Sequence, residues 1–139
     1  NIIEIGTPKK IYFDADHQFV ADFIGRSNLI PAKVISQSAK ETRVSTAIGE
    51  LSCQRREFPP EHDLVLCIRP EFITVGEVEG ANQLSAVVET MVFVGDTYES
   101  ELRVGEQLLM AKLPPETPLE EGSSLTISIQ PEHSLLVIA

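Results

Sequence analysis

The sequence contains one short segment twice, an apolar strand that runs into Pro-Glu. Residues 66–71 read L-C-I-R-P-E, and residues 127–132 read I-S-I-Q-P-E. Proline has no N–H to give to a strand ladder, so each Pro-Glu marks a strand end or a corner. Two such corners predict that the chain is built from one unit used twice.

The sequence repeat extends upstream of both corners, and the matched residues occur in the same order. Asn28 matches Asn82 at an offset of 54 residues, Gly49-Glu50 matches Gly105-Glu106 at 56, and Pro70 matches Pro131 at 61. Small drifts in offset are what loop insertions produce between repeats. We therefore interpret the chain as two tandem modules, with the repeat over 28–71 and 82–132 and the second module extending to 139.

From Leu29 onward apolar residues follow a period of two, which is typical of strands. Turn signals rich in Gly and Pro separate the runs. About ten short strands without a long helix between them predict a mainly β chain, with antiparallel barrels or a sandwich, and five strands per module fit two small OB-like barrels packed together. Which module each terminal strand joins stays open. The predicted strands are 33–35, 42–48, 51–55, 64–68, 72–75, 84–94, 98–104, 107–113, 125–130 and 135–138.

Residues 1–27 do not follow the strand pattern of the later residues and predict a short helical segment ahead of the β modules. Thr7-Pro8 is a helix start, and a second helix begins at Asp14 or Asp16 and ends at Gly25. Its apolar stripe either covers one end of the β modules or joins them to an upstream domain, and we expect both. The stripe consists of Phe19, Val20, Phe23 and Ile24.

Charge and hydropathy exclude several function classes. The formal net charge is −10, from 21 acidic and 11 basic side chains. This balance repels phosphate backbones, so we expect no nucleic-acid partner. The apolar runs are far shorter than the ~20 residues that span a bilayer, so we expect no direct membrane insertion. Cys53 and Cys67 lack the spacing of a zinc site or a disulfide framework and predict plain thiols, buried or at a strand edge, in a reducing compartment.

No sequence motif for catalysis is present. The chain has no phosphate loop, no nucleophile elbow, no H-E-x-x-H and no dinucleotide fingerprint. We therefore predict no catalytic residue, no cofactor-binding residue and no metal site, and expect that this chain is not itself an enzyme.

Two sets of residues remain as binding candidates. Turns rich in backbone N–H groups and hydroxyls can hold a small anion without a basic side chain. The residues of this kind are Gly95, Thr97, Ser123 and Ser124. The acidic Asp96, Glu120 and Glu121 beside them oppose an anion, so the sequence favours plain turns. Arg69 and Glu71 flank Pro70 and form either an internal ion pair or a contact to another domain or subunit.

With these residues in view, the chain resembles the C-terminal part of ATPase subunits of ABC importers. Residues 6–12, G-T-P-K-K-I-Y, and 19–28, F-V-A-D-F-I-G-R-S-N, are similar to the segment that leaves the nucleotide-binding domain in that family. Lys10 stands where the family usually has Glu. Residues 68–71, I-R-P-E, and the block Phe93-Val94-Gly95 with Tyr98 resemble motifs of its TOBE region.

The resemblance implies a regulatory region of OB-like TOBE barrels over 28–139, with residues 1–27 as the end of the nucleotide-binding domain and a linker helix. It implies a parent ATPase that powers solute import, with ATP and Mg in a domain outside this chain, because the phosphate loop, L-S-G-G-Q signature, Walker B strand and switch histidine are absent here. The implied importers take up polyamines, ferric iron, sulfate or sugars. The implied location is cytoplasmic, on the inner face of the cell membrane.

The implied partners are the ATPase domain, the membrane permease subunits and a second copy of the chain. A homodimer would bury strand edges that otherwise invite misassembly, and its candidate interface residues are Phe19, Val20, Phe23, Ile24, Arg69 and Glu71. The alternative is a sensing module that holds a small oxyanion of the molybdate or sulfate type and regulates the transporter.

Overall fold

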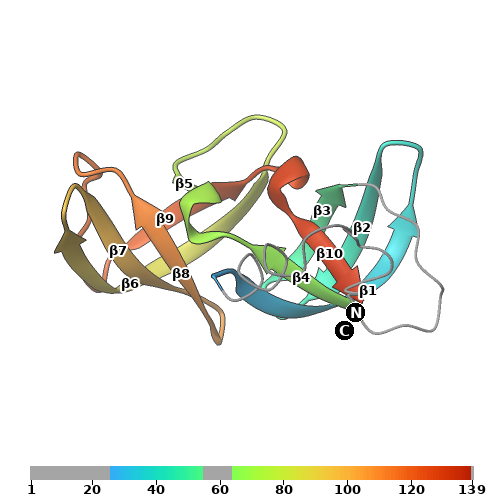
Figure 1. Ribbon diagram of the computed structural model, residues 1–139, viewed down its shortest axis with the longest axis horizontal. Coiled ribbons are helices and arrows are strands. Elements are labelled where there is room, and N and C mark those ends of the chain that lie inside the picture. Colours follow the sequence, from blue (N-terminus) through green and yellow to red (C-terminus); the bar gives the residue numbers. More distant parts are fainter. Residues whose placement is uncertain (1–25, 55–63, 139) are drawn as a thin grey trace.

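The computed structural model describes residues 26–54 and 64–138, which form strands and two short 3-10 helices in two curled antiparallel sheets (Figure 1). In chain order the elements are β1 (Asn28–Gln37), β2 (Glu41–Thr46), β3 (Gly49–Gln54), β4 (Leu64–Ile68), η1 (Pro70–Phe72), β5 (Ile73–Val75), β6 (Asn82–Val94), β7 (Thr97–Val104), β8 (Gln107–Leu113), β9 (Ser124–Ile129), η2 (Pro131–His133) and β10 (Leu135–Ile138).

The mainly β prediction is confirmed, and each of the predicted strands is present. The first strand is longer than predicted, because it already begins at Asn28 rather than at residue 33. The start of β1 was not predicted because Pro31 has no N–H to donate and therefore counts against a strand. The proline is tolerated because residues 28–31 pair with β4 on one side, whereas the pairing of β1 with β2 begins at Ala32. The predicted lead-in helix and its apolar stripe lie outside the described residues.

The two sheets have the same strand order and exchange one strand each. The first sheet runs β10-β4-β1-β2-β3 and the second runs β5-β9-β6-β7-β8. The chain crosses from the first sheet to the second through η1 and returns through η2, as Figure 1 shows. Both crossings begin with the proline of the repeated segment, so the prediction that these prolines mark corners is confirmed. The last strand of the chain therefore completes the first sheet.

The strand register repeats as well. Asn28 opposes Ile68 in the first sheet, and Asn82 opposes Ile129 in the second. A bulge follows Val34 in β1, and another follows Val88 in β6. Because these pairs keep the offset of 54 seen in the sequence, β1 and β6 are matched residue by residue.

The glycine match of the sequence repeat is two residues out of register. Gly105 and Glu106 form the turn between Val104 and Gln107. In the first sheet the turn between Thr46 and Gly49 is made by residues 47 and 48, and Gly49 already belongs to β3. Both glycines have positive φ, 119° for Gly49 and 62° for Gly105, so each eases a tight hairpin from a different position.

The hairpin of β6 and β7 is longer than its counterpart in the first sheet. The paired residues Val34 and Val44 are ten positions apart in the sequence, and Val88 and Leu102 are fourteen apart. The four extra residues lengthen the β6–β7 hairpin. Four residues of the drift in offset from 54 to 61 are thus an insertion at a hairpin end.

One hydrophobic cluster draws on both sheets. Ile30, Leu66 and Leu136 come from the first sheet, and Leu102 and Ile129 come from the second; all five are fully buried. Because β5 and β10 each cross between the sheets, their side chains and those of their neighbours join the two halves of this core. At roughly 1.5–3 kcal/mol for each large apolar side chain, the burial makes a substantial contribution to stability.

Candidate functional site

The seam between the two sheets is held by two asparagines at matched positions. Asn28 Nδ2 donates to the carbonyls of Ile68, at 3.1 Å, and Met110, at 2.9 Å, and its Oδ1 accepts from Met110 N at 2.7 Å. Asn82 Nδ2 donates to the carbonyls of Ile129, at 3.2 Å, and Ser52, at 2.8 Å, and its Oδ1 accepts from Ser52 N at 2.8 Å. Each amide thus pairs with the edge strand of the other sheet as a strand would.

A second pair of matched residues meets where the chain crosses between the sheets. Phe72 ends η1, His133 ends η2, and their rings stack with centroids 4.1 Å apart and planes 14° from parallel. Matched residues that touch each other lie near a pseudo-two-fold axis. The stack and the two asparagines therefore join the sheets into one unit.

Arg69 and Glu71 form an ion pair beside this crossing. Arg69 Nε donates to Glu71 Oε2 at 2.8 Å. Partial burial opposes the charged carboxylate, but the hydrogen bonds from Arg69 and from the backbone outweigh it, so the pKa of Glu71 lies below its ordinary value. Of the two interpretations left open by the sequence, the structure shows the internal pair; a role of these residues in an interface stays a prediction.

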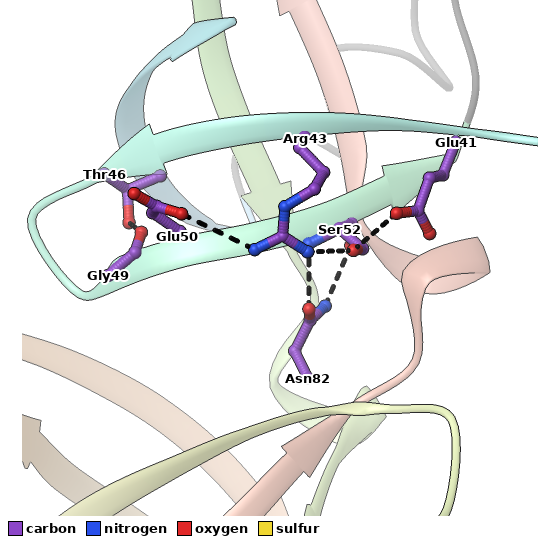
Figure 2. A network of polar contacts seen from close by, with 7 residues as sticks. All are labelled: Glu41, Arg43, Thr46, Gly49, Glu50, Ser52 and Asn82. Carbon is purple, nitrogen blue, oxygen red and sulfur yellow. Dashed lines mark hydrogen bonds and ion pairs between the residues drawn. The ribbon is translucent and has the colours of Figure 1, made fainter. Parts of the chain in front are cut away.

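A polar network lies on the outer face of β2 and β3, and Figure 2 shows that it reaches Asn82 of β6. Arg43 donates to Ser52 Oγ at 2.7 Å and lies 3.7 Å from Glu50 Oε1, and Ser52 Oγ donates to Glu41 at 3.1 Å. The counterparts of Glu50 and Ser52 on β8 are Leu108 and Met110, which are exposed. The two modules thus share a backbone plan but present different outer surfaces.

The longer hairpin ends in three consecutive exposed apolar residues, which we call the hairpin tip. They are Val92, Phe93 and Val94, with 57%, 55% and 46% of their surface exposed. Phe93 meets Tyr98 edge to face, with ring centroids 5.2 Å apart. Residues 92–94 pair with β7 only, because the pairing of β6 with β9 ends at Val87.

Next to the hairpin tip is an open hollow of about 680 Å³ between β5 and the end of β8. Ile73, Val75 and Leu113 belong to its lining, but Ile73 and Leu113 are core residues with only 2% and 1% of their surface exposed. Three carboxylates and one ammonium line it. We call it the β5–β8 hollow; its charged residues are Glu71, Asp96, Glu116 and Lys112.

The anion-loop candidates do not gather into one site. Gly95 makes the turn of the β6–β7 hairpin, and Thr97 begins β7 and lines the hollow. Ser124 belongs to β9, and the Ser123 hydroxyl donates to the carbonyl of Glu120 at 2.5 Å. Three of the hollow's four charged groups are acidic, which disfavours an anion there. A role of the four anion-loop candidates in binding an anion stays a prediction.

Both cysteines are buried and free, as the sequence predicts. Burial raises the pKa of Cys67 to about 12. Burial, and then the nearby charge of Glu41, raise the pKa of Cys53 to about 12 as well. Thiols with such pKa values are not nucleophiles at neutral pH.

Some residues of the seam and of the exposed surface stood out in the sequence, but the sequence did not indicate what they do. Asn28 and Asn82 stood out as repeat partners, but a backbone bond across the seam has no sequence signature. Phe93 and Val94 of the hairpin tip stood out only as part of a TOBE-like motif; their exposure was not predicted, although the change of offset after Val88 marks an insertion. Among residues 26–54 and 64–138 no cluster of metal-ligating side chains is found, and no helix there is long and apolar enough to cross a membrane.

The family model of the TOBE domain matches residues 66–137, which is more than half of the chain. The chain belongs to the TOBE domain family. The match begins within β4 and ends within β10, so it covers the whole second sheet of this TOBE protein and both crossings between the sheets.

The TOBE chain is also similar to curated ATP-binding proteins of importers. It is 36% identical over 103 residues to the spermidine/putrescine import ATP-binding protein PotA of Borrelia garinii subsp. bavariensis, a match that covers 74% of this chain and 28% of the relative. It is 32% identical over 105 residues to the Fe(3+) ions import ATP-binding protein FbpC of Agrobacterium fabrum, covering 75% and 30%. The chain thus spans less than a third of the length of these relatives.

Among solved structures, the TOBE chain has the fold of the cytoplasmic molybdate-binding protein ModG, solved with molybdate bound. The TM-score is 0.71, and the match covers 81% of this chain and 96% of the other. The identity is 14%, so this likeness concerns the fold alone.

Proposed function

We propose that this chain is the C-terminal regulatory and dimerisation domain of the ATP-binding subunit of an ABC-type solute importer. The observation that carries the proposal is the match of about three quarters of the chain to import ATP-binding proteins, at 36% identity for PotA and 32% for FbpC. The parent couples ATP hydrolysis to transport through a domain outside this chain. The permease subunits of the complex are its membrane partners, at the inner face of the cell membrane.

The described residues support a regulatory role rather than a catalytic one. The polar groups of the seam hold the two sheets together, since the side chains of Asn28 and Asn82 form hydrogen bonds with backbone atoms of the opposite edge strands. The thiols are buried. The hairpin tip exposes apolar side chains on both faces of β6, with Val92 and Val94 on one face and Phe93 on the other, and such exposed apolar side chains are suited to contact with protein.

The test compares the parent protein with a truncated form that lacks residues 28–139. We expect the isolated chain not to hydrolyse ATP, and the truncated parent to hydrolyse it but to dimerise more weakly in sedimentation equilibrium. A parent variant carrying Ile35→Ser, an exposed change on β1, serves as the control. Equal dimerisation of full and truncated parents, together with ATPase activity unchanged by the truncation, would contradict the proposal.

Oxyanion sensing is the second candidate, and the fold shared with ModG is compatible with it. The local charges do not favour it, because Glu71, Asp96 and Glu116 outnumber Lys112 around the β5–β8 hollow. We therefore rank it below the dimerisation role and give its test in the Discussion.

A further inference from the structure

The outer face of the first sheet is apolar where β1, β4 and β10 run side by side (Figure 1). Ile30, Leu66 and Leu136 form one row across these strands and are fully buried in the core. Side chains alternate between the two faces of a sheet, so the residues on either side of this row point outward. The outward residues are Leu29 and Pro31 of β1, Val65 and Cys67 of β4, and Leu135 of β10. None of these five carries a charged group, an amide or a hydroxyl.

Most of these outward side chains are accessible. Leu29 has 46% of its surface exposed, Pro31 is exposed, and Val65 and Leu135 are half-buried. Cys67 pairs with Leu29 on one side and Leu135 on the other and is fully buried between them. Neighbouring apolar side chains on one sheet face mark a contact surface, whereas single ones are ordinary. We call Leu29, Pro31, Val65 and Leu135 the apolar outer face.

The second sheet provides an internal comparison, because its residues match those of the first sheet one by one. Asn28 opposes Ile68 and Asn82 opposes Ile129, which fixes a counterpart for each of the five outward residues. All of the counterparts are polar. They are Gln83 for Leu29, Ser85 for Pro31, Thr126 for Val65, Ser128 for Cys67 and Thr74 for Leu135. The same backbone therefore carries a polar outer face in one module and an apolar one in the other.

The polar face of the second sheet holds the chain segment that precedes β6. Val78 N donates to Ser128 Oγ at 3.1 Å, and Gln83 Nε2 donates to the Val78 carbonyl at 3.1 Å. The Ser128 hydroxyl in turn donates to the Gly76 carbonyl at 2.6 Å. The segment before β6 thus covers the counterparts of Cys67 and Leu29 through its backbone.

The last described residues before β1 match those before β6. A turn residue and then a bend precede each strand, at Arg26 and Ser27 and at residues 80 and 81. At the same offset of 54, Val78 corresponds to Ile24, which lies outside the described residues. Ile24 belongs to the apolar stripe of the sequence at positions 19, 20, 23 and 24. An apolar segment therefore precedes β1, the strand that carries half of the apolar outer face.

We propose that residues 19–24 of this chain cover the apolar outer face, with Phe23 and Ile24 against Leu29 and Leu135. Ile24 is five positions before Leu29, and an extended chain spans at most about 3.6 Å per residue, so Ile24 stays within about 18 Å of the face. A segment on so short a tether has an effective concentration of about millimolar, so it needs little intrinsic affinity. The inference does not rest on the proposed function, because it concerns packing within these 139 residues alone.

A double-mutant cycle in the full 139-residue chain tests the contact. Leu29→Ser is made in the unaltered chain and in a chain that carries Phe23→Ser and Ile24→Ser, and urea denaturation gives the unfolding equilibrium constant of each. Leu29→Ser should raise this constant roughly tenfold in the unaltered chain, because one covered apolar side chain is lost. In the chain with the altered segment the same change should raise it less than about threefold, because residues in contact are not additive.

Ile35→Ser is the matched control for this cycle. Ile35 is on the same strand and is 48% exposed, against 46% for Leu29, but it lies at the bulge beyond the pairing of β1 with β4. Its effect should be the same in both chains. Effects of Leu29→Ser that are also the same in both would show that the segment does not touch Leu29. The inference would then be wrong, while the proposed function would still be decided by truncation of the parent.

Thiol labelling gives a second readout that separates local uncovering from loss of stability. Cys67 lies between Leu29 and Leu135, whereas Cys53 lies on β3 opposite the buried Thr42. Global unfolding exposes both thiols, but removal of a cover from the apolar outer face exposes Cys67 alone. Phe23→Ser with Ile24→Ser should therefore speed the reaction of Cys67 with iodoacetamide severalfold and leave that of Cys53 unchanged. An equal change at both thiols, or no change at either, would overturn the inference.

A second copy of the chain is the competing occupant of this face. Sedimentation equilibrium of the same variants distinguishes it from the segment. If the chain associates, and Leu29→Ser abolishes an association that Phe23→Ser with Ile24→Ser leaves unchanged, then the face forms a contact between copies and the inference is wrong.

Discussion

Asn82 bonds to both backbone polar groups of Ser52, a residue 30 positions earlier in the chain and in the other sheet. Its Oδ1 accepts from Ser52 N and its Nδ2 donates to the Ser52 carbonyl, each at 2.8 Å. An amide side chain carries one acceptor and two donors, so it can act here as a one-residue strand. Asn28 makes the matching pair of bonds to Met110, so each sheet is docked on the edge of the other.

We expect Asn82→Ala to destabilise the chain by about 1–3 kcal/mol, because it removes the hydrogen bonds to both partly buried backbone groups of Ser52 on the edge strand β3. Urea denaturation followed by circular dichroism measures the change. Gln83→Ala is the control, since the neighbouring Gln83 is exposed and its Nε2 donates to the Val78 carbonyl at 3.1 Å. An equal effect of the two variants would show that the seam bonds add nothing specific.

Deletion of residues 135–139 should unfold the first sheet although the deleted strand lies at the other end of the chain. β10 covers the edge of β4, and Leu136 is fully buried in the shared core. Loss of one such side chain alone costs about 2–5 kcal/mol. Hydrogen exchange should show lost protection at Val44 and Leu51, and retained protection at both would contradict the strand exchange.

The stability of the chain should fall above about pH 8.5, the ordinary pKa of a cysteine in an unfolded chain. In the folded chain, burial raises the pKa of both Cys53 and Cys67 to about 12. A raised folded pKa gives a stabilising contribution that is fully present below the unfolded pKa and is lost as the pH rises toward the folded one. Urea denaturation at pH 8 and pH 10 measures the loss, and a Cys53→Ala, Cys67→Ala double variant should lose less stability over that interval.

The chain should not bind molybdate or sulfate through the hollow or the turns near it. Glu71, Asp96 and Glu116 oppose an anion there, with Lys112 as the one basic residue of the lining. Isothermal titration calorimetry of the chain with each anion should show no saturable heat. Saturable binding that is weakened by Thr97→Ala, with Ser45→Ala on the exposed face of β2 as the control, would make oxyanion sensing the leading function.

Strand positions and corners followed from the sequence because their causes are local. Alternating apolar residues predicted the strands, and proline marked the corners at Pro70 and Pro131, where a missing N–H ends a ladder. The start of β1 was missed because Pro31 counts locally against a strand. Its tolerance depends on which neighbour pairs with residues 28–31, and that is a property of the sheet.

The repeat, the ten strands and the buried cysteines were therefore determined by the sequence alone. Only the tertiary structure decided that β10 completes the first sheet and β5 the second, that Phe72 stacks on His133, and that the hairpin tip stands beside a hollow. The physical reason is the range of the forces involved. Periodicity and turn chemistry act between near neighbours, whereas strand exchange and surface shape depend on packing between residues that are far apart in the chain.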